Sequence, residues 1–184
     1  MASRALPRPV AQIPNALTVL RLLLIPVYVL LMLAAADEGR SWPAAIVFAV
    51  AGITDQLDGW LARRWRVESA FGKIADPLAD RLMIDAAVVM LWVAGRLPWP
   101  ALALILVRDG LLLAGYRALV PRGLDFSVNF LGKLATWVLY ASLALLMVTA
   151  AGTSWPLWLF WTGVALALAA GAEYALGAIR RLRS

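Results

Sequence analysis

Long apolar runs dominate this sequence and restrict what it can fold into. An α-helix needs about 20 mostly apolar residues to cross the hydrocarbon core of a bilayer. Six such runs are present, separated by breaks that contain Pro, Gly or charged residues. We therefore expect an all-α integral membrane protein with six transmembrane helices, forming a single domain over residues 1–184. The expected spans are Ile13–Ala36, Trp42–Arg63, Ala70–Ala94, Pro98–Leu119, Val128–Ala151 and Trp155–Ile179.

Composition supports the same interpretation. The hydrophobic share of 63% and the mean hydropathy of +0.81 exceed what a soluble chain of this length can bury. The first apolar run lacks a small-residue cleavage site, so we expect no cleavable signal peptide. The net charge of +6 is carried by residues that flank apolar runs, which favours anionic membrane lipids over nucleic acid as the partner.

The distribution of Lys and Arg predicts the orientation. Eleven basic residues flank the helix ends that share a side with the termini, against two, Arg40 and Arg96, at the opposite ends. Because cytoplasmic flanks carry the basic excess, we expect both termini in the cytoplasm, in the plasma membrane of a bacterium. Five tryptophans near the opposite ends are typical of an interfacial aromatic belt. They are Trp42, Trp92, Trp99, Trp155 and Trp158.

The absence of two residue types limits the chemistry. The chain has no Cys and no His, which excludes disulfides, thiolate nucleophiles, zinc–cysteine sites and every His-dependent triad. Acid–base chemistry must then use Asp, Glu, Lys or Tyr. A metal site for a hard cation must be built from carboxylates.

Four aspartates inside the apolar runs are the anomaly to explain. Asp55 and Asp58 are three residues apart near the end of the second run, and Asp76 and Asp80 are four apart in the third. Each pair therefore lies on one face of its helix. A short loop joins the two helices, so they should pack antiparallel with all four carboxylates at similar depth. If these faces meet, the site will be highly acidic.

Divalent cations would resolve the repulsion within such a cluster. Ligand sets made only of oxygen favour Mg²⁺, Mn²⁺ or Ca²⁺. Two metal ions about 3.5–4 Å apart form a recurring clamp for displacement at phosphorus. Small residues adjoin the carboxylates and would leave room for a substrate, although small residues also serve helix packing in membranes. These are Gly59, Ala62, Gly72 and Ala79.

The order of these residues resembles a known signature. From Asp55 to Asp80 the chain reads D-x-x-D-G-x-x-A-R, then eight residues, then G-x-x-x-D-x-x-x-D. This pattern is similar to that of the CDP-alcohol phosphotransferase family. The segment from Asn15 to Arg21 also resembles the N-x-x-T-x-x-R opening of the phosphatidyl-transferring members. Arg81 stands where that branch usually has Lys.

The resemblance implies a role for each matching residue. Two ions, Mg²⁺ or Mn²⁺, would be bound by Asp55, Asp58, Asp76 and Asp80, with Asp80 also acting as the general base. The CDP moiety would contact Gly59, Ala62, Arg63 and Gly72, with Arg63 near the pyrophosphate. The implied reaction is phosphatidyl transfer from CDP-diacylglycerol to an alcohol with release of CMP, at a site facing the cytoplasm. The resemblance also implies a homodimer.

The acceptor alcohol is narrowed but not fixed. Arg108, Arg117 and Lys133 lie toward the expected cytoplasmic half and could bind an acceptor phosphate, although Arg108 with Asp109 could instead form a structural ion pair. The dipeptide Arg108-Asp109 resembles the corresponding sequence of the cardiolipin synthases of this family, so we expect phosphatidylglycerol as acceptor. Glycerol 3-phosphate, which would give a phosphatidylglycerophosphate synthase, is the alternative. Phospholipase D-like cardiolipin synthases need a His and are excluded.

Three further interpretations stay open at this point. A small transporter with an acidic site is the alternative from another class, although the repeats or broken helices of such proteins are not visible. Asp85 is expected to pair with a cation such as Arg108 or Lys133. Arg21 lies too deep in the first run to reach the interface easily, so it is a candidate to face the site.

Overall fold

The regular structure of the protein is α-helical. The computed structural model describes residues 13–65, 70–119 and 130–183, although for some residues near the helix ends the side chain lies outside the description. Helices form close to the predicted spans, and the last one runs on to Arg183 rather than ending at Ile179. The helices are α2 (Ile13–Ala34), α3 (Trp42–Trp65), α4 (Ala70–Val93), α5 (Trp99–Leu119), α6 (Phe130–Val148) and α7 (Trp155–Arg183).

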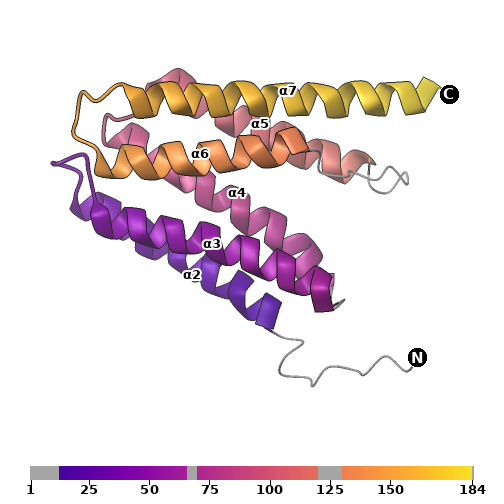
Figure 1. Cartoon of the computed structure of the whole chain (residues 1–184), viewed down its shortest axis with the longest axis horizontal. Helices are drawn as coiled ribbons and strands as arrows, with labels where there is room; N and C mark the ends of the chain where they lie inside the picture. The colour runs from indigo at the N-terminus through magenta and orange to yellow at the C-terminus, as the bar shows by residue number, and fades with distance from the viewer. Residues whose placement is uncertain (1–12, 66–69, 120–129, 184) are drawn as a thin grey trace.

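Two antiparallel hairpins and a crossing helix make up the bundle. Helices α2 and α3 form one hairpin, and α6 and α7 form the other (Figure 1). Helix α4 runs obliquely between them and packs against α2, α3, α5 and α6. The first residues of α2 and the last of α7 lie at the same end of the molecule (Figure 1). Helix α4 therefore links the two hairpins and carries half of the predicted site.

Three helices have the length and apolar character needed to cross a membrane. The apolar segments are Ala16–Ala34 in α2, Phe130–Val148 in α6 and Trp155–Glu173 in α7. Helices α3, α4 and α5 are also long, at 24, 24 and 21 residues, but are less apolar because they carry the charged residues discussed below. All five tryptophans of the predicted belt are exposed, as a lipid-facing position requires. The regular structure of the described residues is thus entirely helical, and three of the helices have the character of membrane spans.

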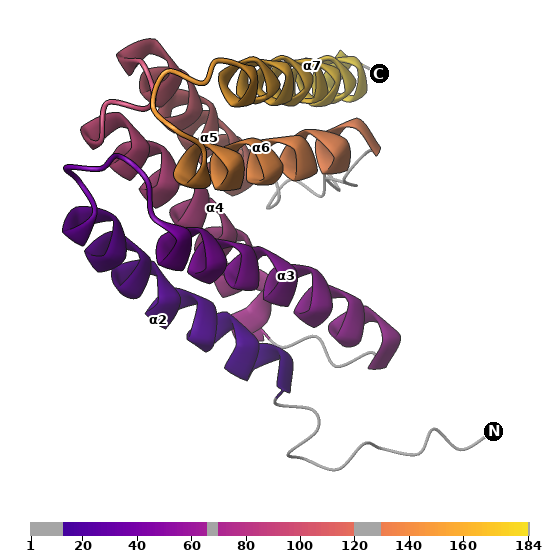
Figure 2. The same ribbon diagram turned by 60° about the vertical axis from the view of Figure 1, so that its left-hand side comes forward.

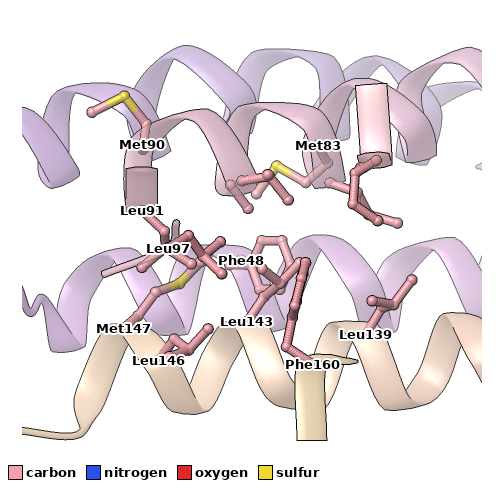
Figure 3. Close-up of a cluster of buried hydrophobic side chains, with 14 of the residues drawn as sticks. Phe48, Met83, Met90, Leu91, Leu97, Leu139, Leu143, Leu146, Met147 and Phe160 are labelled. Carbon is pink, nitrogen blue, oxygen red and sulfur yellow. The ribbon is translucent and has the colours of Figure 1, made fainter. Parts of the chain in front are cut away.

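Apolar side chains from both hairpins meet in one core. Phe48 of α3, Met83 and Leu91 of α4, Leu143 of α6 and Phe160 of α7 point toward one another between the helices (Figure 3). In the turned view, α4 passes behind α3, and α6 and α7 lie above them (Figure 2).

Aromatic contacts join the first hairpin to α6. The ring of Phe48 stacks on Tyr140 at a centroid distance of 4.9 Å and lies 6.0 Å from Tyr28. Gly52 makes this approach possible, since a Cβ there would lie 2.8 Å from the Tyr140 ring. The first hairpin is therefore held directly against the second, one turn of α3 before Asp55.

Arg96 ties together three connections at the end of the bundle away from the predicted site. One of its amino groups, Nη1, donates to the carbonyl oxygens of Thr149 at 2.9 Å and Gly39 at 3.3 Å. The other, Nη2, donates to the Thr149 hydroxyl at 3.2 Å and the Ala150 carbonyl at 3.3 Å. Gly39 has a φ of +62°, which non-glycine residues adopt only with strain. Partial burial, with Arg40 nearby, lowers the pKa of the Arg96 guanidinium, which nevertheless stays charged.

Arg96→Met should destabilise the bundle without touching the predicted site. The substitution leaves the carbonyls of Gly39, Thr149 and Ala150 without this donor. Hydrogen bonds from a charged group contribute about 1.5–3 kcal/mol, so we expect a loss of about 2 kcal/mol in the free energy of unfolding. Denaturant unfolding in detergent micelles measures it. Arg40→Met is the control, because Arg40 is exposed and its ion pair with Glu38 is long at 3.9 Å and therefore weak. Equal stability of the two variants would contradict this role for Arg96.

Candidate active site

The signature aspartates lie on α3 and α4, on either side of the connection between them. Asp55 and Asp58 precede the end of α3, and Asp76 and Asp80 follow the start of α4. At a rise of 1.5 Å per residue, both pairs are roughly 9–15 Å from the connected ends. Helices α3 and α4 also pack against each other. The helices thus carry the four residues at similar depth, as the sequence predicts. The side chains of Asp58, Asp76 and Asp80 lie outside the described residues, so their convergence stays a prediction.

Asp55 is held by a buried arginine from α2. Arg21 Nη1 lies 2.6 Å from Asp55 Oδ1, with the Arg21 side chain fully buried and that of Asp55 21% exposed. A guanidinium inside an apolar bundle is costly unless an opposite charge compensates it. The deep position of Arg21 in the sequence predicts that it faces the site, and its contact with Asp55 agrees with that prediction.

The sequence of α2 explains why Arg21 points inward. Four residues at helical spacing are fully or almost fully buried: Thr18, Arg21, Tyr28 and Met32. Large apolar residues between them, such as Leu23 and Leu30, are exposed on the other face. A polar residue on the lipid-facing side would be expensive, so the inward stripe is where Thr and Arg can be accommodated.

A second group of charges lies where α4 meets α5. We call the four residues Arg81, Asp85, Arg108 and Asp109 the charge cluster. One oxygen of Asp109, Oδ1, accepts from Arg81 Nη1 at 2.9 Å and from Arg108 Nη1 at 2.7 Å. Asp109 is only 4% exposed, and Asp85 is close enough to interact with the other three. The cluster contains two cations and two carboxylates, which balance in formal charge.

The charge cluster bears on two of the sequence predictions. The Arg108–Asp109 ion pair forms. Asp85 lies in the same cluster, but its pairing with a cation stays a prediction. The contact between Arg81 and Asp109 was not predicted. The sequence offered one sign of it: Arg81 and Asp85 are four residues apart, so both lie on one face of α4.

The remaining predicted residues are placed only in part. Gly59, Ala62 and Arg63 are in α3 and Gly72 is in α4, but these positions lie outside the residues with described side chains.

The acceptor-phosphate residues are also incompletely tested. Arg108 is already paired with Asp109, Lys133 is exposed on α6, and the Arg117 side chain falls outside the description. The acceptor site therefore stays a prediction.

The predicted metal centre can be tested only at Asp55. Among the side chains that the structure describes, no three acidic residues gather to form a metal site. Three of the four predicted ligands are outside that set, so this result does not bear on them. What can be seen of the site fits a hard divalent cation: Asp55 offers carboxylate oxygen, and the chain has no His or Cys.

Comparisons with known proteins identify the family. Residues 11–169 match the model of the CDP-alcohol phosphatidyltransferase family. The chain is 33% identical to "CDP-diacylglycerol--glycerol-3-phosphate 3-phosphatidyltransferase" of Bacillus subtilis, covering 74% of this chain and 76% of that protein. A protein of the same name from Escherichia coli K12 is 32% identical, with coverages of 78% and 89%. "Cardiolipin synthase (CMP-forming)" of Streptomyces coelicolor is 37% identical, with coverages of 79% and 69%.

The chain therefore belongs to the CDP-alcohol phosphatidyltransferase family. It is a transferase of phospholipid synthesis in a membrane, and this result favours the enzyme over the transporter alternative. The match includes the whole segment from Asp55 to Asp80, as well as Arg21 and the charge cluster.

Arg21→Met should destabilise the metal-free protein. The substitution leaves the Asp55 carboxylate without its 2.6 Å partner inside the bundle. Breaking a buried ion pair by removing one member costs several kcal/mol, and the partial exposure of Asp55 reduces this to roughly 2–3 kcal/mol. Unfolding in detergent with EDTA present measures the effect. The double variant Arg21→Met/Asp55→Asn is the control and should recover much of the loss, because no unpaired charge remains. A single variant as stable as the parent would argue against the pair.

Proposed function

We propose that the protein transfers the phosphatidyl group of CDP-diacylglycerol to glycerol 3-phosphate and releases CMP. The supporting observation is a family match that contains every fixed position of the signature, with Asp55 held in place by Arg21. Two of the three relatives described above are named for transfer to glycerol 3-phosphate.

We further propose that all six helices cross the membrane, that both termini and the site face the cytoplasm, and that the protein is a homodimer.

The four signature aspartates would hold two Mg²⁺ or Mn²⁺ ions. When bound, these ions would neutralise the pyrophosphate and stabilise the charge that develops on the leaving CMP. Arg21 would keep Asp55 in position by binding its Oδ1 atom. Such a site needs no His, consistent with the composition of the chain.

Other residues of the signature would bind the donor and move a proton. Gly59, Ala62 and Gly72 would leave space for the CDP moiety, and Arg63 would bind its pyrophosphate. Asp80 would accept the proton of the acceptor hydroxyl. The resulting oxygen would attack the phosphorus on the lipid side, and the bond to CMP would break. Arg117 and Lys133, with Arg108, would bind the acceptor phosphate.

Phosphatidylglycerol is the second candidate acceptor. The dipeptide Arg108-Asp109 favours it, as does the similarity to the cardiolipin synthase of Streptomyces coelicolor. Both acceptors carry a glycerol hydroxyl and a phosphate, so the same residues could serve either. The difference between them is size, because phosphatidylglycerol brings two acyl chains from within the bilayer.

An acceptor screen separates the two candidates. Purified protein in mixed micelles, supplied with CDP-diacylglycerol and Mg²⁺, would receive either glycerol 3-phosphate or phosphatidylglycerol, with CMP release and lipid product followed. We expect phosphatidylglycerophosphate from glycerol 3-phosphate. Cardiolipin formed only from phosphatidylglycerol would instead establish the second candidate. Folded protein that releases no CMP with any alcohol would contradict the proposed reaction.

Asp80→Asn should greatly reduce turnover but preserve donor binding. An amide cannot accept the acceptor proton, and positioned general bases contribute roughly 10²- to 10⁴-fold. We expect a loss of turnover in that range, with CDP-diacylglycerol still bound in the presence of Mg²⁺. Asp37→Asn is a matched control, since Asp37 lies in the connection between α2 and α3, at the other end of the bundle. Full activity of the Asp80 variant would refute the general-base role.

A further inference from the structure

Helix α4 carries two polar stripes that are one residue out of step. Positions 76 and 80 belong to the signature, and positions 81 and 85 belong to the charge cluster. One residue turns an α-helix by about 100°, so the two stripes occupy different faces. Helix α4 packs against both α3 and α5. Whatever fixes the face at positions 81 and 85 therefore also fixes the direction of the face at positions 76 and 80.

Asp109 of α5 is the residue that fixes the second stripe. Its Oδ1 atom is 2.9 Å from Arg81 Nη1 and 2.7 Å from Arg108 Nη1. The carboxylate is 4% exposed, while Arg81 and Arg108 are 29% and 18% exposed. Arg108 is the chain neighbour of Asp109 on the same helix. The contact to Arg81 is the ion pair that joins α5 to α4, immediately after Asp80.

The charge cluster is poorly suited to stabilising the fold for its own sake. Its buried Arg108 Nε atom has no hydrogen-bond partner among the described residues, and the carboxylates of Asp85 and Asp109 lie against each other. Buried ionic groups that are incompletely satisfied are often less favourable than well-packed apolar side chains. Apolar residues at these positions would avoid the cost of burying charge, so a directional contact is the property that the ionic groups add.

We propose that Asp109 is a positioning residue for the transfer reaction. Through Arg81 it fixes the rotation of α4 about its axis, and thereby the place of Asp80 relative to the carboxylates of α3. This inference rests on the proposed function, in which Asp80 is the general base. It assigns the Arg81–Asp109 contact to the positioning of Asp80.

A charge-neutral double variant separates positioning from stability. Asp109→Leu alone leaves an unbalanced cation, and Arg81→Met alone leaves an unbalanced carboxylate, so each should lower the unfolding midpoint. Arg81→Met/Asp109→Leu removes one charge of each sign and should recover most of that loss. We expect its kcat with CDP-diacylglycerol and the acceptor identified for the parent protein to stay roughly tenfold to a hundredfold below the parent value, because small displacements of reacting groups have effects of this size. The KM for CDP-diacylglycerol should change little.

Three further variants separate a loss of positioning from a general loss of stability. Arg81→Lys keeps a cation opposite Asp109 and should retain most of the kcat, whereas Arg81→Gln should not; this comparison decides the matter if the double variant fails to fold. Arg96→Met removes another hydrogen-bonded arginine far from the signature and should lower the unfolding midpoint without lowering the kcat of the folded protein.

A double variant with recovered stability and the parent kcat would overturn the positioning role. So would equal kcat values for Arg81→Lys and Arg81→Gln. These results differ from a failure of the proposed function, in which the parent protein itself would release no CMP with any acceptor.

Discussion

Charges buried between apolar helices must be compensated, and the structure of this protein is organised around that requirement. Arg21 cannot be buried in α2 without an anion, and Asp55 on α3 supplies one. Arg81 and Arg108 likewise share Asp109 where α4 meets α5. These contacts connect α2 to α3 and α4 to α5, so the same ion pairs that satisfy the charges also position the two helices that carry the signature.

Much of the fold and the identity of the site follow from the sequence. Apolar runs separated by Pro, Gly and charge predict the helices, because a segment that crosses a membrane must satisfy its backbone hydrogen bonds internally. Helical spacing places Asp55 with Asp58, and Asp76 with Asp80, on single faces. The ends are less predictable: α7 continues to Arg183, since no Pro or Gly breaks it after Ile179.

The choice of partners between helices could not be predicted in the same way. Arg81 and Asp109 are 28 residues apart, and either Asp85 or Asp109 could have served as the anion for Arg108. Helix rotation and crossing geometry decide between them, and these depend on packing such as the stack of Phe48 on Tyr140. Arg96 is a similar case, because it appeared only as an exception in the distribution of basic residues. Its hydrogen bonds to backbone carbonyls require the folded connections to exist first.

The central claim is that the carboxylates of α3 and α4 form one centre for divalent cations. A titration with Mn²⁺, followed by electron paramagnetic resonance on the purified protein in detergent, tests it most directly. Two saturable ions per chain are expected for the parent protein, with fewer ions or much weaker binding in Asp76→Asn and unchanged binding in Glu173→Gln, an acidic position on α7. Absence of saturable binding, or equal loss in both variants, would contradict the claim.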